Sequence, residues 1–211
     1  MPCSRTSWQR GGVAAPSIAR RDLAPDARAL VTIALILGAL VSAAFVLFIG
    51  GEMLSDPGGW QGVGWLAAWL VPSLGLAVFA LLAPRIAYPV LVIAVGVVIA
   101  AAFGSMYAAD AVWAFEDAHG PVNLIVEIGL LMPLVALGRA MPRQAGWLLV
   151  LAIAAPLACQ AIALLIVGQW SVIIVLAIVA LPYAIVALLL ILGGRASSVG
   201  VSGGPAAQQA P

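Results

Sequence analysis

The sequence contains very little charge. Only 8% of its 211 residues are Asp, Glu, Lys or Arg, whereas a soluble domain contains about 25%. A water-solvated surface cannot be built from so few charges, which excludes a soluble fold. The hydrophobic fraction of 64% and the mean hydropathy of +1.17 indicate instead a polytopic membrane protein.

Several reactive or metal-binding residue types are also scarce. The two cysteines, Cys3 and Cys159, lie in a polar tail and in an apolar run, so a disulfide framework and a cysteine metal site are both excluded. His119 is the only histidine, which excludes haem or zinc ligation by several histidines of one chain. The chain has no phosphate-binding Walker loop, G-x-S-x-G or H-E-x-x-H motif. We therefore expect no enzyme, no cofactor and no resident metal.

The basic residues are all arginine, since the sequence has no lysine. This bias, together with the abundance of Ala, Val, Leu and Gly, is typical of a bacterial genome rich in G and C. A net charge of +1 gives no reason to expect a nucleic-acid partner. The partner that the composition does predict is the lipid bilayer.

Six apolar runs follow one another between two polar tails. We predict an all-α integral membrane protein whose residues 29–194 form a bundle of six transmembrane helices, because each run approaches the ~20 residues that cross a bilayer. Residues 1–28 and 195–211 are predicted to be disordered cytoplasmic tails. The six predicted spans are 29–50, 62–83, 86–108, 121–138, 146–167 and 170–193.

The arginines predict how the chain is threaded. If both termini are cytoplasmic, all nine arginines lie on the cytoplasmic side, as the positive-inside rule requires. The charged residues of the loops on the opposite side are then all acidic. The nine are Arg5, Arg10, Arg20, Arg21, Arg28, Arg85, Arg139, Arg143 and Arg195. We therefore expect a multi-pass protein of a bacterial inner membrane with both termini in the cytoplasm.

Small residues recur every four positions in the first and third spans. Such faces let membrane helices pack closely, so we interpret them as contact surfaces for neighbouring helices, a partner membrane protein or a second copy of the chain. The two sets are Ala34, Gly38 and Ser42, and Gly96, Ala100 and Gly104. Prolines inside the spans, at Pro72, Pro133, Pro156 and Pro182, predict helix kinks.

One carboxylate interrupts the fourth span. Glu127 lies six residues inside the span, about 9 Å deep at 1.5 Å per residue, and Asn123 precedes it by one helical turn. A charged side chain facing lipid is costly, so we predict that Glu127 points into the bundle. The polar residues predicted to lie nearest are Asn123, Gln160, Ser105 and Tyr107.

The role of Glu127 has three interpretations. In the first, Glu127 is a proton- or cation-responsive group below an acidic outer vestibule. In the second, it is a neutral acid that joins helices by hydrogen bonds. In the third, its side chain reaches up to the membrane surface. Burial without a cation raises the pKa of a carboxyl group, which is compatible with the first two interpretations.

Two classes of function follow. The first is a non-catalytic accessory or interaction subunit held together by helix packing, and the second is a small transporter or channel-like protein that uses Glu127. We favour the first, because no second ionisable residue continues from Glu127 towards the cytoplasmic side.

The predicted threading can be tested by labelling single cysteines in a chain that lacks Cys3 and Cys159. A cysteine replacing Asp56 should react with an impermeant thiol reagent in intact cells. A cysteine replacing Arg143 should react only after the membrane is opened. The reverse pattern would contradict the predicted orientation.

Overall fold

The computed structural model describes residues 25–53, 55, 59–108, 111, 114, 122–167 and 170–199. Within the helices, the side chains at 52–53, 59, 61, 122–127, 160, 163–167, 170–179 and 197–199 lie outside this description. The predicted tails at 1–24 and 200–211 lie outside it as well, as do the acidic loop residues Asp56, Asp110, Glu116 and Asp117.

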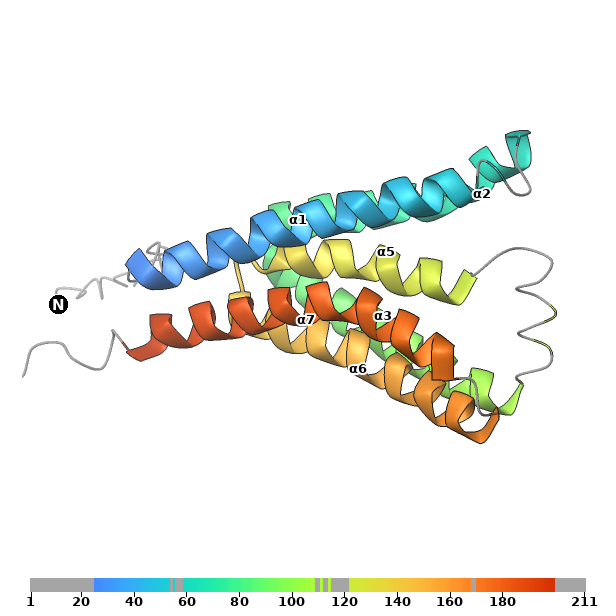
Figure 1. Ribbon diagram of the computed structural model, residues 1–211. Coiled ribbons are helices and arrows are strands. Elements are labelled where there is room, and N and C mark those ends of the chain that lie inside the picture. Colours follow the sequence, from blue (N-terminus) through green and yellow to red (C-terminus); the bar gives the residue numbers. More distant parts are fainter. Residues whose placement is uncertain are drawn as a thin grey trace, which may run out of the picture.

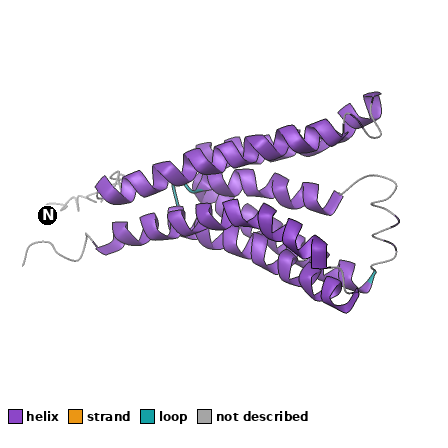
Figure 2. Ribbon diagram, viewed as in Figure 1, coloured by secondary structure: helices purple, strands orange, loops and turns teal. Residues whose placement is uncertain are grey.

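Six α-helices make up the described chain, and Figure 2 shows helix throughout apart from short turns. They are α1 (Pro25–Met53), α2 (Gly59–Leu82), α3 (Pro84–Tyr107), α5 (Val122–Leu137), α6 (Pro142–Val167) and α7 (Trp170–Val199). The predicted all-α fold with six helices is confirmed. Helices are the expected solution, because in lipid each backbone N–H and C=O must find its partner inside the segment.

Four helices contain described stretches that are long and apolar enough to cross a membrane: Pro25–Gly51, Gly62–Leu82, Pro84–Tyr107 and Pro142–Cys159. The described apolar stretches of α5 and α7 are shorter, Ile128–Leu137 and Ala180–Ala196. Among the described residues, every helix except α5 has large apolar side chains that are half exposed or more, including Leu47, Val71, Ile93, Ile162 and Leu181. The chain is a multi-pass helical membrane protein, and these side chains face lipid.

Several helices extend past the predicted spans, and α1, α6 and α7 do so by four residues or more at one end. α1 begins at Pro25, four residues earlier than predicted, because proline suits the first turn of a helix and Asp26 interacts favourably with the helix dipole there. α7 continues to Val199. Its glycines at 193 and 194 pack against α1 and α6, and such tertiary contacts sustain a helix beyond its apolar run.

The turns between α2 and α3 and between α5 and α6 are short. Ala83 alone separates α2 from α3, and its N–H donates to the carbonyl of Phe79 at 2.8 Å. Residues 138–141 separate α5 from α6, and the N–H of Met141 donates to the carbonyl of Leu137 at 3.0 Å. The next helix starts at a proline followed by an arginine in both cases.

α5 is the central helix of the bundle. It contacts α1, α2, α3 and α6, and Gly138 at its end approaches Leu190 of α7. The other five helices surround it in the order α1, α2, α3, α6, α7, and α7 contacts α1 again. Figure 1 shows α5 between the α1–α2 pair and the remaining helices. The span that carries Glu127 is therefore the one with neighbours on every side.

Glycines determine how closely the neighbours approach α5. A β-carbon at Gly38 of α1 would lie 2.6 Å from Cγ1 of Val135, and one at Gly138 would lie 2.9 Å from Cδ2 of Leu190. Real β-carbons do not come so close to other atoms, so only glycine allows these contacts. Leu134, Leu137 and Pro133 of α5 are fully buried as a result.

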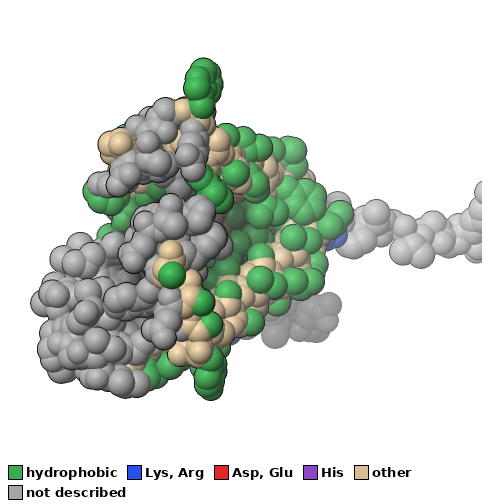
Figure 3. All heavy atoms as spheres, turned by 90° about the vertical axis from the view of Figure 1, so that its right-hand side faces the viewer, with side chains coloured by type: hydrophobic (Ala, Val, Ile, Leu, Met, Phe, Trp, Pro, Cys, Tyr) green, Lys and Arg blue, Asp and Glu red, His purple; other side chains and the backbone are tan. Residues whose placement is uncertain are grey.

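The described arginines gather at one end of the bundle. α1 begins there, α7 ends there, and the two short turns lie there as well (left in Figure 1). This arginine end carries Arg28, Arg85, Arg139, Arg143 and Arg195. Figure 3 looks at the opposite end, where the surface of the described side chains is almost entirely hydrophobic.

The two small-residue stripes have different surroundings. On α1, Ala34 and Ser42 are buried and Gly38 contacts α5, so this stripe is covered within the chain and is not a surface for another protein. On α3, Gly96, Ala100 and Gly104 are exposed. A β-carbon at Gly96 or Gly104 would meet no atom within 4 Å.

Candidate functional site

The predicted site around Glu127 is only partly described. The backbones of Asn123 and Glu127 lie in the first half of α5, and that of Gln160 lies in the second half of α6. Their three side chains are outside the described part of the structure. The predicted grouping of Glu127 with polar neighbours therefore stays a prediction.

The helix geometry of α5 nevertheless defines the face on which Glu127 lies. Residues four, seven and eleven positions further along share that face, and these are Leu131, Leu134 and Gly138. All three are buried, and Gly138 approaches α7. The face that continues from Glu127 is thus an internal one throughout the described turns.

The two predicted neighbours on α3 have their own surroundings. The hydroxyl of Ser105 donates to the carbonyl of Ala102 in the same helix at 2.7 Å, which satisfies it locally. Tyr107, in the last turn of α3, is 92% exposed. Their positions relative to the side chain of Glu127 lie outside the described part of the structure.

A pair of polar side chains on α2, Trp69 and Ser73, packs against Gly129 of α5. Ser73 donates to the carbonyl of Trp69 at 2.8 Å, and both side chains abut Gly129, where a β-carbon would overlap Nε1 of Trp69. That indole N–H is buried and has no hydrogen-bond partner among the described atoms. A buried donor without a partner is costly, so the close contact of Trp69 with α5 is maintained by packing.

A second polar contact joins α1 to α7. The ring of Tyr183 is fully buried and stacks on Phe45 with centroids 5.7 Å apart. Its hydroxyl lies 3.5 Å from Oγ of Ser42, and either oxygen can be the donor. The distance is long for a hydrogen bond between hydroxyls, so the pair mainly satisfies two buried polar atoms while the rings provide the packing.

Sequence reasoning missed Tyr183, Trp69 and Ser73. The available signals were a tyrosine in the middle of the apolar run ALPYAIV, and the spacing of four between Trp69 and Ser73, which places both on one helix face. Neither contact contains an acid, a base or a nucleophile arranged for chemistry. Both are contacts that hold helices together.

No protein-family model matches the chain, and neither a characterised protein nor a solved structure matches it. The fold and the described polar contacts define the class as a multi-pass helical membrane protein. Within the described side chains, no three His, Cys, Asp or Glu residues come together as they would around a metal ion.

Proposed function

We propose that this protein is a non-catalytic membrane subunit that binds a transmembrane helix of a partner, or of a second copy, through α3. The observation that carries the proposal is the α3 stripe, formed by Gly96, Ala100 and Gly104. All three residues are exposed, and among the described residues no atom lies within 4 Å of a β-carbon built at Gly96 or Gly104. In lipid, helices associate where small residues let their backbones approach.

The other close helix contacts show what such glycines do in this chain. Gly38, Gly129, Gly138, Gly146, Gly193 and Gly194 each lie against a side chain or backbone atom of a neighbouring helix. The spacing of four seen in the α3 stripe also occurs on α1, where α5 and α7 cover it. By analogy, the α3 stripe is suited to a helix that another chain supplies.

Glycine has an energetic cost inside a helix, where it is about 1 kcal/mol less favourable than alanine. At Gly96 and Gly104 the described part of the chain offers no close contact that would compensate for this cost. A partner helix that packs on the stripe would provide that compensation through close van der Waals contact.

For the cell, we propose a bacterial inner membrane with the arginine end in the cytoplasm. The positive-inside rule supports this orientation, since all five described arginines lie at one end of the bundle.

The α3 stripe can be tested with a photo-crosslinking residue at position 100 in native membranes. We expect an adduct heavier than the 21.5 kDa chain. Replacing Gly96 and Gly104 with leucine should reduce its yield at least about tenfold, a loss of about 1.4 kcal/mol of association free energy, because the larger side chains hold the partner backbone away.

The matched control is Gly75→Leu on α2, which also has no atom within 4 Å of its β-carbon but lies outside the stripe. It should leave the adduct unchanged. The variants should keep the thermal stability of the isolated chain. If position 100 forms crosslinks to lipid only, the docking role of α3 is wrong.

A second candidate function is a small transporter or channel-like protein with Glu127 as its titrating group. It is supported by the buried face formed by Leu131, Leu134 and Gly138, which continues from Glu127 on the central helix. An ionisable group inside a membrane bundle is a common mark of proton or cation pathways.

Substitutions of Glu127 separate the two functions. Glu127→Gln keeps the size and hydrogen-bonding capacity of the side chain but cannot titrate. If Glu127 only joins helices, the Gln variant keeps near-normal thermal stability and Glu127→Leu lowers it, because buried polar partners lose their bonds. If Glu127 is the titrating group of a transporter, the Gln variant should fold normally but show no pH-dependent cation flux into proteoliposomes. Flux that is identical in wild type and Gln variant would rule out the transport function.

A further inference from the structure

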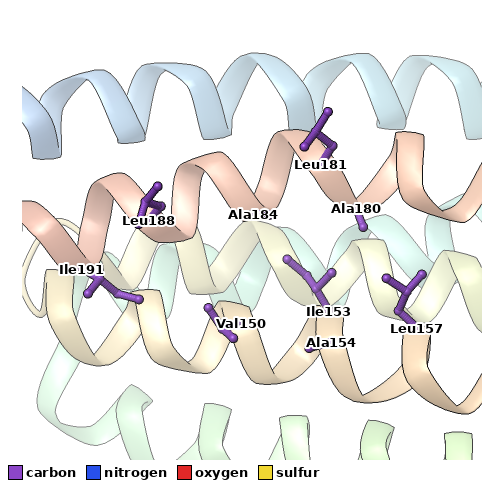
Figure 4. Close-up of a pocket in the computed structure, with 9 residues that line it drawn as sticks. All are labelled: Val150, Ile153, Ala154, Leu157, Ala180, Leu181, Ala184, Leu188 and Ile191. Carbon is purple, nitrogen blue, oxygen red and sulfur yellow. The ribbon is translucent and has the colours of Figure 1, made fainter.

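An apolar groove runs along the outside of the bundle between α6 and α7. Its volume is about 540 Å³, and its lining includes Val150, Ala154 and Leu157 of α6 and Ala184, Leu188 and Ile191 of α7 (Figure 4). Ala154, Ala184 and Leu188 are exposed, so the groove opens to the surroundings of the bundle.

The groove results from a change in helix separation. At the arginine end, α6 and α7 are in very close contact, since a β-carbon at Gly194 would lie 2.7 Å from Cβ of Arg143. One turn further along, a β-carbon at Gly146 would lie 2.6 Å from Cγ1 of Ile191. Beyond that point, small alanines on both helices leave a space between α6 and α7, and this space is the groove.

Two arginines stand at the closed end of this groove. Arg143 precedes Val150 by seven residues, and Arg195 follows Ile191 by four, so each lies on the helix face that lines the groove. Gly194, which precedes Arg195 in the sequence, packs against the backbone of Arg143, and both arginine side chains are exposed. Asp26 is the one acid among the described side chains of the arginine end, against five arginines.

The described lining of the groove on α7 runs from Ala180 to Ile191, about 16 Å of helix, and its Ile191 end lies next to the arginine end. An acyl chain whose headgroup lies at the arginine end can therefore extend along it.

The described lining of the groove consists of alanine, valine, leucine and isoleucine side chains only. Such a surface suits the hydrocarbon chain of a lipid.

We propose that the α6–α7 groove binds an anionic phospholipid, with one acyl chain in the groove and the phosphate at Arg143 and Arg195. Arginine pairs with phosphate through parallel hydrogen bonds, and basic clusters at helix ends are the usual sites for anionic headgroups. The site lies on a different face from the α3 stripe and does not depend on the proposed partner.

Native mass spectrometry of the full chain, with phosphatidylglycerol titrated in mild detergent, tests this site. We expect one tightly bound phosphatidylglycerol and weaker binding of phosphatidylcholine with the same chains. Arg143→Gln combined with Arg195→Gln should weaken phosphatidylglycerol binding roughly thirty-fold, as expected for two surface charges. The control Arg85→Gln, an exposed arginine at the same end but on α3, should bind phosphatidylglycerol as wild type does.

Two further measurements distinguish a lipid site from a phosphate site. Ala184→Phe fills the groove and should weaken phosphatidylglycerol binding although both arginines remain. Glycerol 3-phosphate, which has no acyl chain, should not displace the lipid at equal concentration. The proposal is wrong if both lipids bind equally, if Arg85→Gln weakens binding as much as the double variant, or if glycerol 3-phosphate competes. Thermal unfolding of each variant must match wild type, and Ala154→Leu replaces Ala184→Phe if that variant unfolds.

Discussion

The close approach of α5 to the helices around it is the contact on which the rest of the bundle depends. In lipid, the hydrophobic effect does not drive helices together, and association relies on packing and interhelical bonds. Gly38, Gly129 and Gly138 remove the side chains that would separate α5 from α1, α2 and α7. A side chain at any of them would displace a neighbouring helix and loosen the ring around α5.

The ring is not equally tight on all sides. Gly146, Gly193 and Gly194 close the contacts of α7 with α6 and α1 at the arginine end. The contacts of α2 with α1 and α3 are the least extensive of the ring, and the α3 stripe stays open. Packing inside the chain thus covers the small-residue stripe on α1, whereas the α3 stripe and the α6–α7 groove are exposed, and these are the two surfaces at which we propose binding.

Much of the fold could be predicted from the sequence, because six apolar runs separated by polar residues leave few alternatives to six helices in a membrane. The internal prolines also lie in helices as predicted. The sequence could not distinguish the buried stripe on α1 from the exposed stripe on α3, since both have the same spacing of small residues. Nor could it show that α5 is central, because a helix position in a bundle depends on contacts among all the helices.

The polar site was harder to predict than the fold. Glu127 is recognisable in the sequence as a candidate site residue because charge is rare in this chain. Tyr183 and Trp69 contain apolar rings, so in the sequence they resemble ordinary core residues. Ser105 was predicted to be one of the polar residues nearest to Glu127, which stays a prediction; its hydroxyl donates to a carbonyl of its own helix. Hydroxyl groups in membrane helices can satisfy themselves in this way, so their presence near a charge in the sequence does not establish a contact.

We propose that another helix covers the α3 stripe in the membrane, and the oxygen accessibility of a nitroxide label at position 100 in native membranes tests this. The label is attached in a chain without its own cysteines. A label at Leu151, a half-exposed side chain of α6 outside the groove, gives the reference for lipid contact. We expect clearly lower oxygen accessibility at position 100 than at position 151. Equal accessibility at the two positions would contradict the proposal.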